Sequence, residues 1–377
     1  MRVLQVAPFF YPHAGGVESH VRGISRELAR QGHSVIVLTS RHDPALPERE
    51  EFEGYTILRT PCWGVWFNTP VNPEVGRWAR ELGADVAHLH FPPPLTPYFA
   101  ARGLDHSAVP VCVTYHCDLY LATAFGRLAT ELFNHVFLPS ILRRADRVIV
   151  HTESYGQTSR GLGGRPFEVI PSSVDLLRFR PDVDGSAVRE RLGLGEGPVL
   201  AFAGRLVPHK GLEPLLRAVS RLPPKVRLLV VGRGPELPAM QELARRLGIA
   251  ERVRFCSEVS DAELPAYLRA ADLFVFPSTN RLEGFGLAVA EAMAAGLPVI
   301  VTDMPGVREV IQPGREGLLT EPLLEGDLVE RIQELMDDPG RRRSMGAAGR
   351  RRAEELFDVR AVTRSLVRTY EGLAAAG

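Results

Sequence analysis

Two glutamates, Glu283 and Glu291, bracket the segment of this sequence whose residue types are best suited to chemistry. The segment reads EGFGLAVAE and is followed by AMAAGLPV. Gly284 and Gly286 allow backbone N–H groups to approach a ligand closely, because no Cβ is in the way. The alanine-rich run predicts a helix whose N-terminus favours an anion, with Glu291 a turn or more inside it. The alternative is a glycine-rich turn with two solvated glutamates.

A second segment, GRLVPHKG at 204–211, follows an apolar run directly. It carries Arg205, a two-pronged hydrogen-bond donor, and Lys210, a compact cation, and both types bind phosphate. Only two of the 45 basic residues are lysines, Lys210 and Lys225, so a lysine inside a motif stands out. The pair suits a diphosphate leaving group. Two surface cations on a solvated loop are the competing interpretation.

Two weaker signals lie in the first half of the chain. Gly15 and Gly16, in GGVESH, precede a predicted helix and suit close approach to a phosphate or a sugar, although a plain turn is the commoner explanation. His116, in VTYHCD, ends a predicted strand and is expected to face a cleft. A histidine at such a place is more often structural.

The sequence favours no metal site. His88 and His90 share one face of a strand because side chains alternate with period two, and with His116 they could form a trio, but no carboxylate cluster accompanies them. The D-x-D at 182–184 lies away from any strand end and is interpreted as a turn. The G-x-G at 232–234 lacks the third glycine of a dinucleotide fingerprint.

The elements that must position these residues alternate between apolar runs and helical periods. Val17, Val21, Ile24 and Leu28 follow the helical spacing. The apolar runs are short, β-branched and unbroken, as in a parallel sheet covered on both faces. The predicted strands are Val3–Ala7, Val35–Thr39, Val86–Leu89, Val111–Thr114, Val148–Val150, Val199–Ala203, Arg227–Val231, Val253–Phe255, Leu273–Phe276 and Val299–Val301.

These strands form two series, separated by a polar, turn-rich stretch near Pro171–Gly195. We therefore predict an α/β protein with two Rossmann-like, doubly wound parallel-sheet domains that face each other across a cleft. The expected domains are 1–172 and 173–358. The amphipathic segment 359–377 either ends the second domain or packs back on the first.

Composition narrows the function classes. The chain has 377 residues, with 45 basic and 45 acidic side chains and no formal net charge, which argues against nucleic acid as a partner. No apolar run approaches the ~18 residues of a membrane span, and MRVLQVAPFF is typical of a buried strand rather than a signal peptide. Four cysteines without a C-x-x-C pair indicate a reduced, cytoplasmic protein, either free or in peripheral contact with the inner membrane face.

The chain resembles glycosyltransferase family 4, the retaining nucleotide-sugar transferases with a GT-B fold, over essentially its full length. The motifs that carry the resemblance are GGVESHV, TYH at 114–116, GRLVPHKG, VVGRGPE at 230–236 and, above all, the E-x7-E of 283–291 together with the R-x4-K of 205–210. Within the family it is loosely similar to the phosphatidylinositol mannosyltransferases. One departure is PSSVD at 171–175, where the family commonly has PNGVD.

The resemblance implies that domain 1–172 lies on the acceptor side and that domain 173–358 binds the donor. It also implies a role for each motif. It implies that Arg205 and Lys210 hold the donor diphosphate, that Glu291 binds the ribose hydroxyls, and that His116 lies beside the transferred sugar. It also implies a donor that is a UDP- or GDP-linked hexose, a sugar or lipid-linked hydroxyl acceptor, and no metal cofactor. The remaining positions are Glu283, Gly284, Phe285, Gly286 and Leu287 for sugar and phosphate, Gly15 and Gly16 for the diphosphate, and the backbone at Glu258 and Val259 for the base.

The mechanism implied by the resemblance is front-face attack with retention, in which a donor phosphate oxygen takes the acceptor proton. The positive charges of Arg205 and Lys210 would stabilise the leaving diphosphate. A retaining glycosidase that uses Glu283 and Glu291 is disfavoured, because the two carboxyls of such enzymes lie about 5–5.5 Å apart, whereas a helical span of eight residues is about 12 Å long. The alternatives that remain are a nucleotide-sugar epimerase and a binding module without turnover.

An aromatic segment, Trp63–Phe67, lies outside the predicted strands. It is a candidate interfacial patch or lipid-acceptor pocket, and Arg77 and Arg80 flank Trp78 nearby. Residues 1–180 hold 18 basic and 17 acidic side chains, so no polybasic anchor is present. Burial of the aromatics against their own domain is the expectation we favour.

Overall fold

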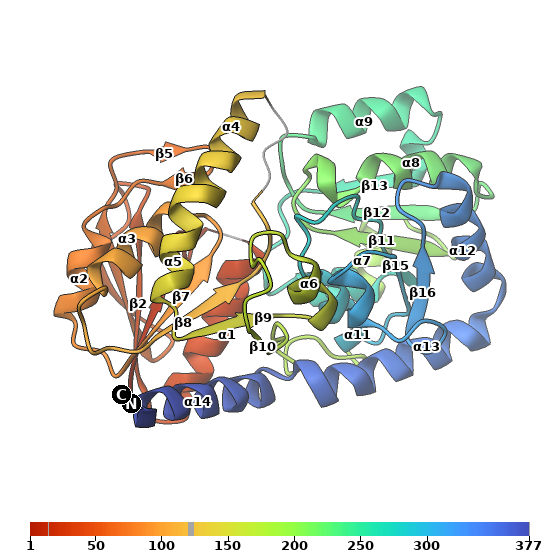
Figure 1. The fold of residues 1–377 in the computed structure, drawn as a ribbon. Coiled ribbons are helices and arrows are strands. Elements are labelled where there is room, and N and C mark those ends of the chain that lie inside the picture. The colour runs from red at the N-terminus through yellow and green to blue at the C-terminus, as the bar shows by residue number, and fades with distance from the viewer. Residues whose placement is uncertain (14, 120–123, 377) are drawn as a thin grey trace. The chain divides into compact units, whose positions relative to one another are not determined.

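The computed structural model describes residues 1–13, 15–119 and 124–376. It divides into two compact units (Figure 1). Unit 1 contains Met1–Ser173 and Val359–Gly377, and unit 2 contains Val174–Asp358. The sequence placed the boundaries at 172/173 and 358/359.

The sheet of unit 1 has eight strands in the order β10-β9-β8-β7-β1-β2-β4-β3. All neighbours pair in parallel except β3, an antiparallel edge strand. The strand order reverses between β1 and β7, which places the switch point there. The bounds are β1 Arg2–Val6, β2 Ser34–Arg41, β3 Arg49–Phe52, β4 Tyr55–Pro61, β7 Val86–Phe91, β8 Val111–Tyr115, β9 Arg147–Val150 and β10 Glu168–Val169.

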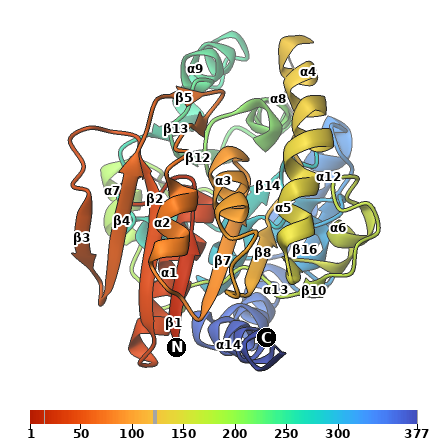
Figure 2. The ribbon, with the colours of Figure 1, turned by 60° about the vertical axis from the view of Figure 1, so that its left-hand side comes forward.

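Helices cover both faces of this sheet, because its inner strands bury apolar side chains on both sides. Helices α1 and α14 pack on one face, and α2, α3, α5 and α6 pack on the other; Figure 2 shows α2 and α3 lying across the strands. The bounds are α1 Gly16–Arg30, α2 Val75–Glu81, α3 Leu95–Gly103, α4 Ala124–Leu132, the π-helix η1 Phe133–Phe137, α5 Leu138–Arg144, α6 Glu153–Thr158 and α14 Val359–Ala376.

The sheet of unit 2 has six parallel strands in the order β13-β12-β11-β14-β15-β16. From β11, the strands β12 and β13 follow in order toward one edge of the sheet. From β14, the strands β15 and β16 follow toward the other edge. The switch point therefore lies between β11 and β14. The bounds are β11 Val199–Ala203, β12 Arg227–Val231, β13 Val253–Cys256, β14 Leu273–Phe276, β15 Val299–Thr302 and β16 Gly317–Thr320.

The helices of unit 2 also form two layers, one against each face of its sheet. Helices α8, α9 and α12 enclose one core, and α7, α10, α11 and η5 enclose the other. The bounds are α7 Ser186–Arg191, η2 Pro208–Lys210, α8 Leu212–Arg221, α9 Leu237–Arg246, η3 Ala250–Arg252, α10 Leu264–Arg269, α11 Leu287–Ala294, η4 Val307–Val310, α12 Glu325–Asp337, α13 Pro339–Arg352 and η5 Ala353–Phe357.

All ten predicted strands are present, each shifted by no more than a few residues. Four sheet strands were missed, namely β3, β4, β10 and β16. Strand β3 has the sequence REEF and lies at the sheet edge, where charged side chains discourage pairing with other chains. Strand β4 contains Arg59, whose buried guanidinium bonds to Glu50 and to two backbone carbonyls, so its pattern does not read as an apolar run.

The aromatic segment forms a small hairpin, β5 Val65–Trp66 and β6 Thr69–Pro70, and the expectation that it is buried is wrong. Trp63 is 74% exposed, Trp66 71% and Phe67 57%. The two short strands pair only with each other, and so no sheet offers these rings an apolar surface. The hairpin leaves three large aromatic side chains in solvent.

Candidate functional site

The charged motifs of unit 2 come together at one edge of its sheet. Segment 204–211 follows β11 and segment 277–286 follows β14, the two strands at the switch point. Because all six strands are parallel, both segments lie at the carboxyl edge, where open α/β sheets bind ligands. The sequence placed these motifs on separate strands, and the strand order makes them neighbours.

Glycine lets the two segments touch through their backbones. Gly211 has φ +75°, and a Cβ there would lie 1.8 Å from the carbonyl oxygen of Pro277. The backbone N–H of Thr279 donates to the carbonyl of His209 at 2.8 Å. Gly232 serves a similar purpose, because its Cβ would lie 2.0 Å from the carbonyl oxygen of Gly204. The lone G-x-G thus has a packing role at this edge.

Lys210 and Glu283 form an ion pair across the switch point. The other Glu283 oxygen accepts a hydrogen bond from the backbone N–H of Gly286 at 3.0 Å, and Gly286 is the N-cap of α11. The Lys210 ammonium also lies 4.9 Å from the centre of the Phe276 ring, a cation–π distance. The anion that the sequence predicted at this helix N-terminus is, in this structure, the carboxylate of Glu283.

Arg205 differs from Lys210. Its side chain is exposed, and among the residues that the structure describes it has no ion-pair or hydrogen-bond partner. His209 lies between the two cations in sequence, and burial together with the charge of Lys210 lowers its pKa to about 4. His209 is therefore neutral at pH 7, so that Arg205 and Lys210 supply the positive charge of this loop.

Glu291 lies in α11, with its side chain 13% exposed. Burial raises the pKa of its carboxyl to about 7, against the opposing attraction of Arg178. The Arg178 guanidinium lies 3.7 Å from Glu291 Oε1 and stacks on the Phe179 ring at 4.4 Å. Sequence analysis missed Arg178, because it lies in the segment after PSSVD, 113 positions before its partner in the chain.

The other predicted positions of unit 2 divide by burial. Gly284, Phe285 and Gly286 are buried, and the Phe285 ring packs at 89° against Phe357, so its side chain belongs to the core. Glu258 is exposed and Val259 is half-buried; both follow β13 at the same carboxyl edge. Asp184 accepts from the backbone N–H of Ser186 at 2.9 Å, which confirms the turn predicted for the D-x-D.

In unit 1, the glycine pair marks the start of α1. Gly16 is its first residue and Gly15 its N-cap. A Cβ added at Gly15 would lie 2.3 Å from an oxygen of the Glu18 carboxylate. A Cβ added at Gly16 would have no atom within 4 Å. Glu18 also pairs with His13 at 3.2 Å. The open side of this turn is therefore at Gly16.

His116 lies at the end of β8 and is 9% exposed. Both of its ring nitrogens have protein partners: Nε2 lies 3.1 Å from His90 Nδ1, and Nδ1 lies 2.8 Å from His151 Nε2. His88 and His90, expected to share a strand face, have ring centres 4.3 Å apart. Within the described ranges, no three His, Cys, Asp or Glu side chains are grouped to hold a metal ion.

These imidazoles belong to a longer buried series, which we call the histidine chain. It contains residues that sequence analysis did not connect with the site, including one from the C-terminal helix. In order, its members are Ile170, through its carbonyl, then His151, His116, His90, Gln5, Tyr370, His88 and Thr114.

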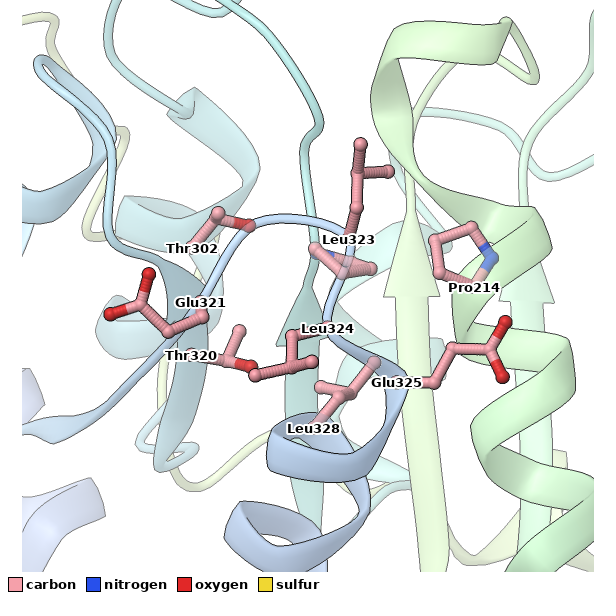
Figure 3. Close-up of a pocket in the computed structure, with 9 residues that line it drawn as sticks. Pro214, Thr302, Thr320, Glu321, Leu323, Leu324, Glu325 and Leu328 are labelled. Carbon is pink, nitrogen blue, oxygen red and sulfur yellow. The ribbon is translucent and has the colours of Figure 1, made fainter.

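One small cavity of unit 2 is lined by Pro277 but by none of the predicted site residues. Figure 3 shows its lining, which comes from the ends of β14–β16 and the starts of α8 and α12. Its volume is about 10 Å³, near the minimum that holds one water molecule. It is too small for a nucleotide.

Two family models divide the chain between them. The model described as Glycosyltransferase Family 4 matches residues 14–178, and Glycosyl transferases group 1 matches residues 186–352. A GDP-mannose-dependent alpha-(1-6)-phosphatidylinositol monomannoside mannosyltransferase of Mycolicibacterium smegmatis is 30% identical over 365 residues, 92% of each chain. The chain belongs to glycosyltransferase family 4.

Further relatives match this chain over essentially its whole length. A phosphatidyl-myo-inositol mannosyltransferase of Mycobacterium leprae is 30% identical, covering 100% of this chain and 98% of that one. The structure of sucrose-phosphate synthase from Thermosynechococcus elongatus superposes with a TM-score of 0.85 at 25% identity and covers 100% of both chains. The GT-B fold expected from the family resemblance is confirmed.

Membership makes this chain a glycosyltransferase. The epimerase alternative finds no support, since these relatives are named as transferases and a synthase. Within the described residues, no helix is both long enough and apolar enough to cross a membrane.

Proposed function

We propose that this glycosyltransferase moves a hexose, with retention and without a metal, from a UDP- or GDP-linked sugar to a hydroxyl acceptor. The observation that carries the proposal is the charge arrangement at the β11/β14 switch point. Arg205 is exposed and unpaired among the described residues, and Lys210 is held by a carboxylate. A diphosphate offers the anionic oxygens that both cations would bind.

Donor binding exchanges one anion for another. Glu283 now neutralises Lys210 and accepts from Gly286 N–H. When the diphosphate binds Lys210 and Arg205, the Glu283 carboxylate is released to accept hydrogen bonds from sugar hydroxyls. The same exchange leaves the backbone of Gly284–Leu287 beside the donor. The buried carboxylate therefore has hydrogen-bond donors in both states: Lys210 and Gly286 N–H before the donor binds, and Gly286 N–H with the sugar hydroxyls afterwards.

The remaining roles follow the family resemblance. Glu291 accepts from the ribose hydroxyls, and the backbone at Glu258 and Val259 meets the base. Gly15, Gly16 and His116 of unit 1 serve the diphosphate and the transferred sugar. In the reaction, the bond from the anomeric carbon to the diphosphate oxygen breaks, and a bond to the acceptor oxygen forms on the same face. The acceptor proton moves to a donor phosphate oxygen.

The first donor to test is GDP-mannose, since two relatives are named as mannosyltransferases and one as GDP-mannose-dependent. Thermal unfolding in EDTA is measured with GDP, UDP and their sugar conjugates. A ligand at 100 times its Kd stabilises by about 2.7 kcal/mol, which raises Tm by several degrees. A shift with one nucleotide supports the metal-free donor site and names the base. A shift that needs Mg²⁺ contradicts metal independence, and none in either buffer contradicts the donor site.

Retention is tested separately. The product formed from an α-linked donor is analysed by NMR for the configuration of its new bond. An α-linked product supports retention, and a β-linked product contradicts it.

The acceptor is lipid-linked, and the β5–β6 hairpin contacts the bilayer. Trp63, Trp66 and Phe67 are exposed on the hairpin, and Leu128 and Leu132 are exposed on α4. Both elements lie toward the same end of unit 1 (Figures 1 and 2). Indole rings favour the bilayer interface. Unit 1 holds 19 basic and 17 acidic side chains, an excess too small for a polybasic anchor, so binding depends on insertion of these rings and is only weakly sensitive to salt.

Vesicle co-sedimentation tests this contact. We expect Trp63→Ser with Trp66→Ser to reduce binding to anionic lipid vesicles at least tenfold in low and in 0.5 M salt. The control is Leu323→Ser, which removes an apolar side chain in unit 2 that is 68% exposed. No binding by the unaltered protein at low salt, or equal binding by the double variant, contradicts the bilayer contact.

A further inference from the structure

The histidine chain begins at a group whose role in hydrogen bonding is fixed. The carbonyl of Ile170 can only accept, so the His151 nitrogen 3.0 Å away, Nδ1, must carry a proton. A neutral imidazole has one N–H, so His151 Nε2 is then an acceptor. The His116 Nδ1 atom, 2.8 Å from it, must donate. By the same reasoning His116 Nε2 accepts from His90 Nδ1.

The order of donors then reaches Gln5. Three neutral imidazoles supply three protons, but four hydrogen bonds connect Ile170 to the Gln5 side chain. The fourth proton comes either from an imidazolium or from the amide group of Gln5. The rings of His90 and His116 are buried, and burial lowers the pKa of both well below the ordinary value. The amide therefore donates to His90. The structure has Gln5 Oε1 toward His90 and Nε2 toward Tyr370, so this assignment turns the amide by a half-turn, which exchanges its two ends and leaves the other atoms in place.

The Gln5 orientation fixes the rest of the series. After that half-turn the amide oxygen occupies the position 3.3 Å from the Tyr370 hydroxyl that the amide nitrogen holds in the structure, and the hydroxyl donates to it. The oxygen of Tyr370 then accepts from His88 Nδ1 at 2.6 Å, and His88 Nε2 accepts from the Thr114 hydroxyl at 2.6 Å. Every donor in the series meets an acceptor, and no ring is charged.

We infer that this one-way series of hydrogen bonds holds the His116 ring neutral, with its proton on Nδ1. Four residues position His116 in this way: Gln5, His90, His151 and Tyr370. Neither ring nitrogen of His116 is left for proton transfer, so His116 acts by shape and polarity rather than as an acid or a base. The donor and acceptor assignments in the histidine chain do not depend on the proposed function. Only their effect on the rate of sugar transfer rests on it.

The surroundings of His116 support the neutral form. His20 lies beside it, with ring centres 5.7 Å apart, and His151 at 4.8 Å. The charged form of any one of these rings would face the others in a buried space, at a large cost in desolvation. The backbone N–H of Ser173 donates to His20 Nδ1 at 3.3 Å, which places the proton of a neutral His20 on Nε2.

The test is ¹⁵N NMR of histidine-labelled protein, in which N–H and lone-pair ring nitrogens have distinct shifts. We expect His116 to carry its proton on Nδ1 alone and to show no titration from pH 5.5 to 8.5. A proton on Nε2, or a second proton in that range, overturns the inference and leaves the proposed function untouched. Gln5→Glu provides a carboxylate that only accepts, and should create one doubly protonated ring.

Kinetics test the positioning role. Tyr370→Phe removes the hydroxyl that orients Gln5, and we expect kcat to fall about tenfold, the effect of one hydrogen bond, with nucleotide Kd unchanged. The control is Thr363→Val on the same helix. The buried Thr363 hydroxyl has no hydrogen-bond partner among the residues that the structure describes, so its loss should not alter kcat. An unchanged kcat in Tyr370→Phe contradicts positioning. Loss of nucleotide binding by the unaltered protein would instead contradict the donor site.

Discussion

The switch-point site of unit 2 and the histidine chain of unit 1 satisfy their buried polar groups in different ways. At the switch point of unit 2, charges are paired: Lys210 with Glu283, and Glu291 with Arg178. In unit 1, the histidine chain contains no charge and satisfies its donors and acceptors one by one. A paired charge can be exchanged for a ligand charge, whereas a neutral series can only be kept or broken. The first arrangement suits binding, and the second suits fixed geometry.

The largest expected effect is that of Lys210→Ala. The change removes a cation from the diphosphate site and leaves Glu283 without its partner. We expect kcat/KM to fall about 10³-fold, as for the loss of a preorganised electrostatic group. The control is Lys225→Ala, which removes an exposed lysine far from the motif. A fall of less than tenfold would mean that the Lys210–Glu283 pair is structural. Paired charges would then not distinguish a binding site in unit 2 from the histidine chain in unit 1.

A smaller effect is expected from Glu291→Gln. Hydrogen bonds to a charged acceptor contribute about 1.5–3 kcal/mol, so nucleotide Kd should rise about 10- to 100-fold. In the unaltered protein the pKa of Glu291 is raised to about 7. The carboxylate therefore forms as pH rises from 6 to 8, and affinity should rise with it. Calorimetric titration of the nucleotide over this range checks both points, and an equally steep pH dependence in the Gln variant would contradict the role.

The same pKa has a consequence for stability. The folded-state pKa lies above the unfolded value of 4.5, so the folded state holds this proton more tightly. The contribution of Glu291 to stability is most favourable below about pH 4.5 and is lost as pH rises through about 7. A bound nucleotide should offset that loss.

The smallest expected effect is that of Arg178→Gln. Removing this guanidinium leaves burial to act alone on Glu291, so the midpoint of the pH dependence of nucleotide affinity should move upward. The matched control is Arg180→Gln, whose side chain pairs with Asp182 instead and whose midpoint should stay in place. A shift that is equal in the two variants would show a general charge effect and no specific pair.

Much of the switch-point site of unit 2, the proposed donor site, was predictable because its residues follow strands. Glu283 and Lys210 come soon after apolar runs, and parallel strands end at one edge, so their proximity follows from strand order. Arg178 could not be found in this way, because no strand or helix period connects it to Glu291. Their pairing depends on how segment 174–180 packs beneath α11.

The unit 1 region was less predictable. His116, His88 and His90 were visible as strand histidines, but their partners were not. Tyr370 reaches His88 across 282 positions of sequence, through a helix that the sequence assigned to either domain. The hairpin aromatics were expected to be buried because their segment is apolar. Composition does not show whether the fold offers a surface that can cover such a segment, and here the rings stay exposed.

The place of α14 in unit 1 has a consequence for synthesis of the chain on the ribosome. Residues 1–173 emerge first, and α1 then covers only part of one sheet face; the rest stays uncovered until Val362, Leu366 and Tyr370 of α14 arrive. The intervening unit 2 is continuous and can fold as it emerges. At about 5–20 residues per second, the nascent unit 1 waits roughly 10–40 s for its last helix. During that interval its exposed apolar strip is a target for chaperones, and a premature stop before residue 359 would make the exposure permanent.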